Sequence, residues 1–130
     1  MLILATLVTA LLFGGMVLYS FGFAAFLFSA LPHEVAGPTI RRAFPLFYLF
    51  VLGTAALAAA LMWSSDTLSA GLLAIIAVSV IPTRQFLMPA INRATDAGSK
   101  TQFKLLHGAS VIITLCHIGG AGYVLARLAA

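Results

Sequence analysis

Two histidines in an otherwise apolar segment are the residues most suited to chemistry in this chain. His107 and His117 lie in the last of its long apolar stretches. Ionisable side chains inside a membrane helix are costly, so they usually face a cavity, a ligand or a polar partner. At about 100° per residue, Ser110 and Thr114 fall on the same side of a helix as the histidines, within an arc of roughly 80°. This polar face can line a path through the protein, or it can bond to neighbouring helices and to carbonyls one turn earlier.

A haem held between these two histidines is excluded by their spacing. They are ten residues apart, or roughly 15 Å along a helix axis, whereas two axial ligands must meet at one iron atom. His33, the remaining histidine, lies in a polar segment, and no other apolar stretch carries one. We therefore expect no cofactor. A haem held by a single histidine, or between two subunits, is left open and would make the chain a redox protein.

A second set of polar residues lies at the ends of the apolar stretches. Its members are His33, Glu34, Arg84, Asn92, Arg93, Asp96 and His107. Imidazole and carboxylate groups can bind a divalent metal, but no two of them here have the spacing of ligands on one helix face. These residues also have a simpler explanation that needs no metal. Arg93 and Asp96, three residues apart, can form an exposed ion pair, and Glu34 can cap a turn. The sequence does not decide whether a metal binds.

The chain lacks the residue sets typical of enzymes and of nucleic-acid-binding proteins. It has three acidic residues, one cysteine (Cys116) and no phosphate-binding loop. Neither paired carboxylates nor a nucleophile beside a base can be assigned. Its seven basic residues are not interleaved with aromatic side chains as in a nucleic-acid surface. We predict a protein that is not an enzyme, has no catalytic residues and binds no nucleic acid.

The composition indicates which elements carry these residues. Hydrophobic residues make up 62% of the 130 residues and charged residues 8%, against roughly 45–50% and about 25% in soluble domains. Four apolar segments are long enough to cross about 30 Å of hydrocarbon as helices. The sequence therefore predicts an all-α integral membrane four-helix bundle, with a single transmembrane domain over residues 1–130. The expected spans are residues 2–31, 44–63, 67–88 and 104–126.

Local signals predict where the helices begin. The segment 32–38 (PHEVAGP) is typical of a polar loop, and Thr39 can cap the helix that follows it. Asp66 comes after two serines and is expected to cap the third helix. Ser99 and Gln102 have the spacing of a capping box, so we expect the fourth helix to begin there.

The third helix is expected to change character along its length. It is apolar from about Leu68 to Ile81, and then contains Pro82, Arg84 and Pro89 while its apolar rhythm continues. We predict one long helix, kinked at one of the two prolines, that leaves the hydrocarbon at its far end. Arg84 is expected to extend its side chain toward the near membrane surface.

Length and small residues distinguish the first two helices. The uncharged run from Leu2 to Leu31 measures roughly 45 Å as a helix, against about 30 Å of hydrocarbon. This helix must therefore tilt, protrude or be covered by a partner. Both helices also contain small residues, which let helices approach closely in membranes. They are Gly14, Gly15 and Gly22 in the first helix and Gly53, Ala56 and Ala60 in the second.

The distribution of basic residues predicts the orientation. Six of the seven lie in the first and third loops and the adjoining helix ends, and only Arg127 lies on the opposite side. The positive-inside rule then places those two loops in the cytoplasm and both termini on the non-cytoplasmic side of a cell inner membrane. The first segment lacks the basic start of a signal peptide, so we expect it to be retained. The six are Arg41, Arg42, Arg84, Arg93, Lys100 and Lys104.

Several short motifs occur in the order found in one membrane family. They are Leu31-Pro32, Ala36-Gly37, Phe44-Pro45 with Tyr48, Pro89-Ala90-Ile91-Asn92 with Asp96, and Phe103 with Leu106-His107-Gly108 and Ser110. On these residues the chain resembles the transmembrane protein 205-like family, four-helix membrane proteins of unknown function. That family often has an asparagine four residues after the serine, where this chain has Thr114. Because the function of that family is unknown, the resemblance implies the fold but no activity.

We expect a small accessory or structural subunit that associates by helix packing with a larger membrane complex or with itself. Its expected partners are the lipid bilayer and other membrane subunits or further copies of the chain. The alternative is a transporter or ion-handling protein with a polar cluster around His107, in which Tyr48 hydrogen-bonds to His107 if the second and fourth helices adjoin. The cluster would contain His107, Ser110, Asn92, Asp96, Tyr48 and Arg84.

Overall fold

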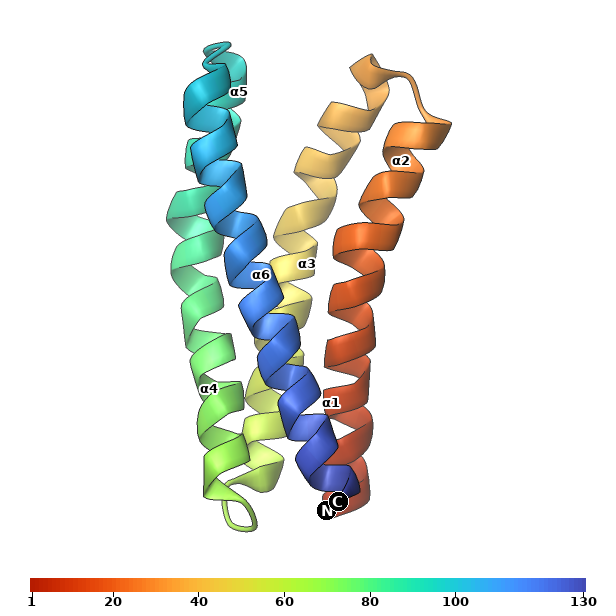
Figure 1. Ribbon diagram of the computed structural model, residues 1–130, viewed down its shortest axis with the longest axis vertical. Helices are drawn as coiled ribbons and strands as arrows, with labels where there is room; N and C mark the ends of the chain where they lie inside the picture. The colour runs from red at the N-terminus through yellow and green to blue at the C-terminus, as the bar shows by residue number, and fades with distance from the viewer.

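The computed structural model describes residues 1–130 and consists of four long helical rods joined by short turns (Figure 1). Successive rods run in opposite directions, and both termini lie at the same end of the bundle. The first rod contains α1 (Leu2–Val17), the π-helix η1 (Leu18–Phe23) and α2 (Ala24–Ala30). The other rods are α3 (His33–Met62), then α4 (Thr67–Pro82) with the π-helix η2 (Thr83–Leu87) and α5 (Met88–Asp96), and finally α6 (Lys100–Ala129).

All four rods are long and apolar enough to cross a membrane. They contain 29, 30, 30 and 30 residues, and a helix needs about 20 apolar residues to span the hydrocarbon. The predicted all-α membrane bundle of four helices is therefore confirmed, and the chain is a multi-pass membrane protein. The rods comprise Leu2–Ala30, His33–Met62, Thr67–Asp96 and Lys100–Ala129.

The second helix begins earlier than the sequence suggests. The predicted polar loop over residues 32–38 is wrong, because α3 already starts at His33 and only Leu31 and Pro32 interrupt the helices. Thr39 does not cap a helix, since its hydroxyl donates to the carbonyl of Val35 within α3 (2.7 Å). Polar residues beside a membrane are stable in a helix too, because water reaches the free N–H groups of its first turn. Polarity alone therefore did not locate the turn.

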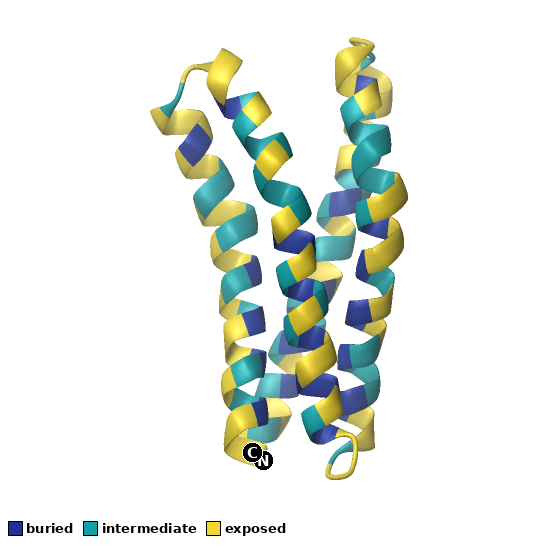
Figure 2. Ribbon diagram, turned by 180° about the vertical axis from the view of Figure 1, so that it is seen from behind, coloured by how far each residue is buried: buried dark blue, intermediate teal, exposed yellow.

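The hydrophobic core lies in the half of the bundle that contains the termini. Figure 1 shows the four rods close together there, whereas at the other end the pair α2–α3 diverges from the pair α5–α6. In Figure 2 most buried positions also lie in the half that contains the termini. The main residues of this core are Ala5, Leu12, Met16, Val51, Ala55, Ala58, Met62, Ala70, Leu73, Ile76, Ala77, Val80, Ala121 and Val124.

Glycines explain how closely the rods approach in this half. A Cβ atom on Gly15 of α1 would lie 2.6 Å from the ring of Phe50 on α3. A Cβ atom on Gly122 of α6 would lie 3.1 Å from the ring of Phe13 on α1. Both distances are shorter than ordinary carbon contacts, so a methyl group at either position would require the facing ring to shift. The close approach expected of Gly15 is therefore made within the chain.

Two π-helical segments lie where the pairs of rods diverge. Leu18 begins η1 sixteen residues after the start of the first rod at Leu2, and Thr83 begins η2 sixteen residues after Thr67. A π-turn inserts an extra residue and bends the helix axis. In the third rod this irregularity falls between Pro82 and Pro89, the two positions at which a kink was predicted. Pro89 has no N–H and its ring would clash with the carbonyl four residues earlier, which widens the helix before it.

The short turn after α3 is held by charged groups, as its sequence predicts. The carboxylate of Asp66 accepts hydrogen bonds from the backbone N–H (3.2 Å) and the hydroxyl (2.6 Å) of Ser69, so Asp66 is the cap of α4. Arg127, near the end of α6, donates to the same carboxylate (3.2 Å). The hydrogen bonds from Ser69 lower the pKa of the Asp66 carboxyl below its usual value, and Arg127 lowers it further. Three rods are thus joined at this end.

We predict that Asp66 makes the bundle sensitive to acid. A carboxyl whose pKa is lower in the folded state stabilises the fold fully above its unfolded pKa of about 3.9, and the stabilisation is lost as the pH falls through the folded pKa. The melting temperature of the wild-type protein in detergent should therefore fall between about pH 5 and about pH 2. In Asp66→Asn the fall should be smaller. Glu34→Gln, which removes a carboxylate without an ion pair, should behave as wild type. Equal acid sensitivity of all three proteins would contradict the prediction.

We predict that alanine lowers the stability of the protein at Gly15 but not at the adjacent Gly14. Gly15→Ala should lower the stability by about 1–3 kcal/mol, because the new methyl group overlaps the ring of Phe50. Gly14→Ala should leave it unchanged or raise it by up to about 1 kcal/mol, since no atom lies within 4 Å of that position and alanine favours helix. Unfolding of both variants in mixed micelles measures the difference. If Gly15→Ala proves as stable as Gly14→Ala, the close crossing of α1 and α3 is not present.

Candidate functional site

The structure places the six residues of the expected polar cluster in separate contacts. His107 is exposed on α6 and stacks on Phe103, with the ring centroids 5.2 Å apart and the planes 7° from parallel. The hydroxyl of Ser110 donates to the carbonyl of His107 (2.7 Å), within the same helix. No hydrogen bond joins His107 to Asn92, Asp96, Arg84 or Tyr48. Of the expected cluster, the structure therefore brings only Ser110 to His107, one turn away on the same helix.

Tyr48 belongs to an aromatic cluster on the other side of the bundle. It is buried against Phe47, with the ring centroids 5.4 Å apart, and against Phe44 at 6.2 Å. The expected contact with His107 is not formed, because α3 packs along α1 and α4 rather than along α6. Sequence reasoning missed Tyr19 of η1, whose ring stacks on Phe47 (5.0 Å) and whose hydroxyl donates to the carbonyl of Ala43 (2.8 Å). Its position one helix turn before Phe23 gave only a weak signal.

Two arginines connect α3 to the third rod at the end where the rods diverge. Arg41 donates to the carboxylate of Asp96 (2.7 Å) and to the carbonyl of Asn92 (3.3 Å). The predicted surface pair of Arg93 with Asp96 is therefore wrong, because Arg41 of the neighbouring rod binds the carboxylate instead. Arg84 donates to the carbonyl of Pro45 on α3 (3.3 Å) and to the side chain of the adjacent Gln85 (3.2 Å). Asn92, Asp96 and Arg84 thus serve contacts between rods.

His117 is the one histidine that the fold encloses. It is 9% exposed, and its Nε2 atom lies 2.8 Å from the hydroxyl of Ser79 on α4. That hydroxyl has a single hydrogen, which it donates to the carbonyl of Ile76 (3.1 Å). The contact between the two side chains is a hydrogen bond that links α6 to α4, with the donor set by the tautomer of the imidazole. On the polar face of α6, His117 thus bonds to another helix, whereas Ser110 bonds within α6 and His107 stacks on Phe103 of the same helix.

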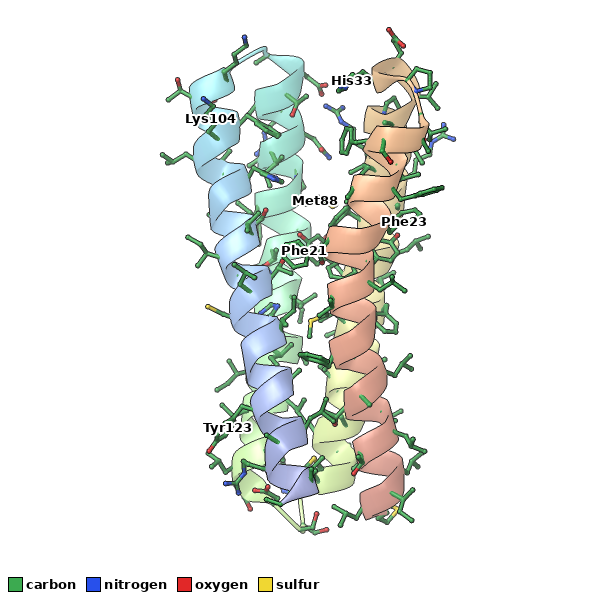
Figure 3. The ribbon with its side chains drawn as sticks, turned by 45° about the vertical axis from the view of Figure 1, so that its right-hand side comes forward. Phe21, Phe23, His33, Met88, Lys104 and Tyr123 are labelled. Carbon is green, nitrogen blue, oxygen red and sulfur yellow. The ribbon has the colours of Figure 1, made fainter.

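The arrangement of possible metal ligands is dispersed. No three side chains of His, Cys, Asp or Glu lie close enough together to hold one ion. His33 packs against Phe28 at the start of α3, with the centroids 6.1 Å apart, and Cys116 is exposed. Figure 3 shows His33 and Lys104 at the end of the bundle away from the termini, while Met88 and Phe21 lie between the diverging pairs of rods.

An apolar groove of about 740 Å³ runs between the first rod and α3. Its residues come from three elements of the first rod and from one face of α3. Gly15 and Gly22 line it together with several aromatic rings. A groove of this composition can accept a hydrocarbon chain or the side chains of another helix. The other lining residues are Leu11, Leu18, Tyr19, Phe23, Phe26, Leu46, Phe47 and Phe50.

Comparison with known protein families places the chain in a family of membrane-like domains. A family model described as Domain of unknown function (DUF4149) matches residues 7–100. The chain belongs to the DUF4149 family. No curated protein and no solved structure matches it. The part shared with DUF4149 covers most of the first three rods, so the contacts of Tyr48, Arg41 and Asp96 fall inside it and His107 and His117 fall outside. Membership agrees with a membrane domain but assigns no activity.

We predict that the bond between Ser79 and His117 stabilises this DUF4149 protein. Ser79→Ala removes the partner of a buried imidazole, and bonds between membrane helices contribute about 1 kcal/mol. Ser110→Ala is the matched control, because its hydroxyl bonds only to a carbonyl of its own helix. Unfolding in mixed micelles should show a loss of about 1 kcal/mol for Ser79→Ala and a smaller loss for Ser110→Ala. Nitrogen NMR shifts of His117 that are identical in wild type and Ser79→Ala would disprove the bond.

Proposed function

We propose that this protein is an accessory or structural membrane subunit that associates with a partner helix through the outward face of α3. The face is defined here by Leu46, Leu49, Gly53, Ala56, Leu57 and Ala60 and is called the α3 outer face. At helical spacing these residues form one continuous strip over four turns. The proposal includes association with a further copy of the chain or with another membrane protein.

The observation that carries the proposal is the exposure of small residues on this face. Gly53, Ala56 and Ala60 are all exposed, and no atom lies within 4 Å of a Cβ built on Gly53. In membranes small residues concentrate where helices pack, because they let backbones approach, whereas lipid gives no such preference. The opposite face of the same helix follows this rule, since Ala55 and Ala58 are fully buried against neighbouring rods. The α3 outer face has the same composition without a neighbour in the chain.

The apolar groove supports the same conclusion by its position. It borders the α3 outer face at Leu46, which is 66% exposed, and at Phe50. A helix packed on Gly53 would therefore meet large side chains and a recess on one side of the contact. Knobs that enter such recesses are how helices gain van der Waals contact in lipid.

The proposal also includes how the bundle is oriented in the membrane and in which membrane it lies. The turn between α2 and α3 and the turn between α5 and α6 lie at one end of the bundle, together with six of the seven basic residues. The positive-inside rule supports a cytoplasmic position for this end, with both termini outside, and an inner membrane as the location. The narrower membership in the transmembrane protein 205-like family belongs here as well, supported by Leu106-His107-Gly108 and Ser110 beyond the matched residues.

The transport and haem alternatives have less support from the geometry. Arg41 binds the carboxylate of Asp96 and the backbone carbonyl of Asn92, and Tyr48 is enclosed by aromatic rings, so no contact joins these residues to His107. The Nε2 atom of His117 shares a hydrogen bond with the hydroxyl of Ser79, and this bond would have to be lost for that nitrogen to ligate an iron atom. Association through α3 requires no such rearrangement.

We predict that bulky residues on the α3 outer face abolish assembly. The double variant Gly53→Leu with Ala60→Leu should convert the assembled wild-type protein into a monomer, because two isobutyl groups hold the partner backbone away. The matched control is Gly119→Leu with Ala126→Leu, which enlarges two exposed positions of α6 at the same seven-residue spacing. Native mass spectrometry of protein released from membranes by mild detergent measures the state of each.

Two results would contradict the proposed function. The first is a wild-type protein that leaves the membrane as a stable monomer. The second is a loss of assembly in the α6 variant equal to that in the α3 variant, which would indicate a general effect of bulky residues. Circular dichroism of both variants checks that the four helices are retained.

A further inference from the structure

A second recess lies at the turn between α5 and α6, at the end of the bundle away from the termini (Figure 1). It has a volume of about 390 Å³. Most of its lining residues are polar or glycine, but the surface that they present to the recess is mainly carbon, with the lysine ammonium groups at its edge. The residues that matter for its chemistry are Thr95, Gly98, Ser99, Lys100, Phe103 and Lys104.

Two lysines without acidic partners give this pocket its charge. Lys100 and Lys104 are exposed and make no ion pair. The nearest acidic residue in sequence, Asp96, is bound by Arg41 at 2.7 Å and so does not neutralise them. Because the lysines are four residues apart on α6, their side chains start from the same face of the helix. His107, three residues further on, continues that face toward the membrane interior.

The local backbone also favours an anion at this place. Gly98 has a φ of +67°, a conformation that glycine adopts without strain, and it directs the chain into α6. Ser99 occupies the cap position of α6, but its side chain makes no capping hydrogen bond. The expected capping box with Gln102 is therefore not formed, and the hydroxyl of Ser99 is left as a donor within the pocket. The free N–H groups of the first turn of α6 add to the two lysines.

Below the charged part the pocket continues into an apolar surface. Phe103 lines the pocket and stacks in parallel on His107. Lys100 is the first residue of α6, whose 30 residues measure about 45 Å against about 30 Å of hydrocarbon, so its first turn extends to the headgroup level. The flat face formed by Phe103 and His107 then lies one to two turns deeper. Charge above and hydrocarbon below match one kind of molecule.

We propose that this pocket binds an anionic phospholipid, with its phosphate between Lys100 and Lys104 and an acyl chain along Phe103 and His107. Basic pockets at the ends of membrane helices recognise anionic headgroups in this way. The bilayer presents phosphates at this depth permanently, whereas a soluble phosphate would gain nothing from the aromatic surface. The role also accounts for His107, whose ring makes no hydrogen bond within the protein and lies beside Phe103 along the path of the acyl chain.

Lipid titration of the purified, delipidated protein tests the proposal. Native mass spectrometry would measure the binding of phosphatidylglycerol, phosphatidylcholine and inorganic phosphate to three proteins. These are the wild type, the double variant Lys100→Gln with Lys104→Gln, and the double variant Arg42→Gln with Arg93→Gln. The last variant is the matched control, because it removes two exposed, unpaired cations from the same end of the bundle. We expect the lysine variant to bind phosphatidylglycerol about thirtyfold more weakly than wild type does. The arginine control should lose less than about threefold in affinity for the same lipid. Phosphatidylcholine should bind weakly to all three.

Several outcomes would overturn the proposal. Equal weakening in the lysine and arginine variants would indicate only general attraction between a basic surface and anionic lipid. Inorganic phosphate that binds as tightly as phosphatidylglycerol would point to a soluble anion rather than a lipid. An unchanged affinity of the lysine variant would place the lipid elsewhere. The variant Phe103→Ala gives a separate measurement, since it should weaken phosphatidylglycerol binding while leaving both lysines in place.

Discussion

Hydrocarbon cannot hydrogen-bond to a peptide group, and this constraint determines most of the structure. Of 111 backbone hydrogen bonds, 99 lie within the helices, and the turns that leave the helices are only a few residues long. Prolines inside the rods do not break them, and Pro38 and Pro45 lie within α3. Pro32 stands between two rods, and the local disturbance around Pro82 and Pro89 takes the form of a π-helical segment rather than a break. The bundle is therefore four continuous rods, and its differences from a regular bundle are bends.

Because of these bends, the bundle has two halves that are held together by different interactions. In the half with the termini, glycine and alanine let the rods touch, and the bond between Ser79 and His117 and the pairing of Asp66 with Arg127 join them. In the other half the rods diverge, and long arginine side chains span the distance between them. Van der Waals contact falls off steeply with distance, so the first half supplies most of the packing. The second half leaves polar groups and backbone accessible at the membrane surface.

This division explains why the molecule offers surfaces rather than an enclosed site. The small-residue strip of α3 faces outward along the tightly packed half, and the basic pocket of α6 lies at the end of the divergent half. The two features are far apart along the bundle and differ in composition, one being neutral and smooth and the other charged. They suit different neighbours, a protein helix for the first and a lipid headgroup for the second. Both kinds of neighbour are present in the bilayer that the apolar composition requires.

The sequence by itself determined what depends on neighbours along the chain. Hydropathy over about 20 residues identified the four rods, the position of Asp66 identified the cap of α4, and two nearby prolines identified the irregular part of the third rod. Only the tertiary structure decided which rods adjoin. Since α3 packs on α1 and α4, Tyr48 does not meet His107, and Arg41 rather than Arg93 binds Asp96. A side chain selects its partner by distance in space, and hydropathy, which is alike in all four rods, carries no information about that distance.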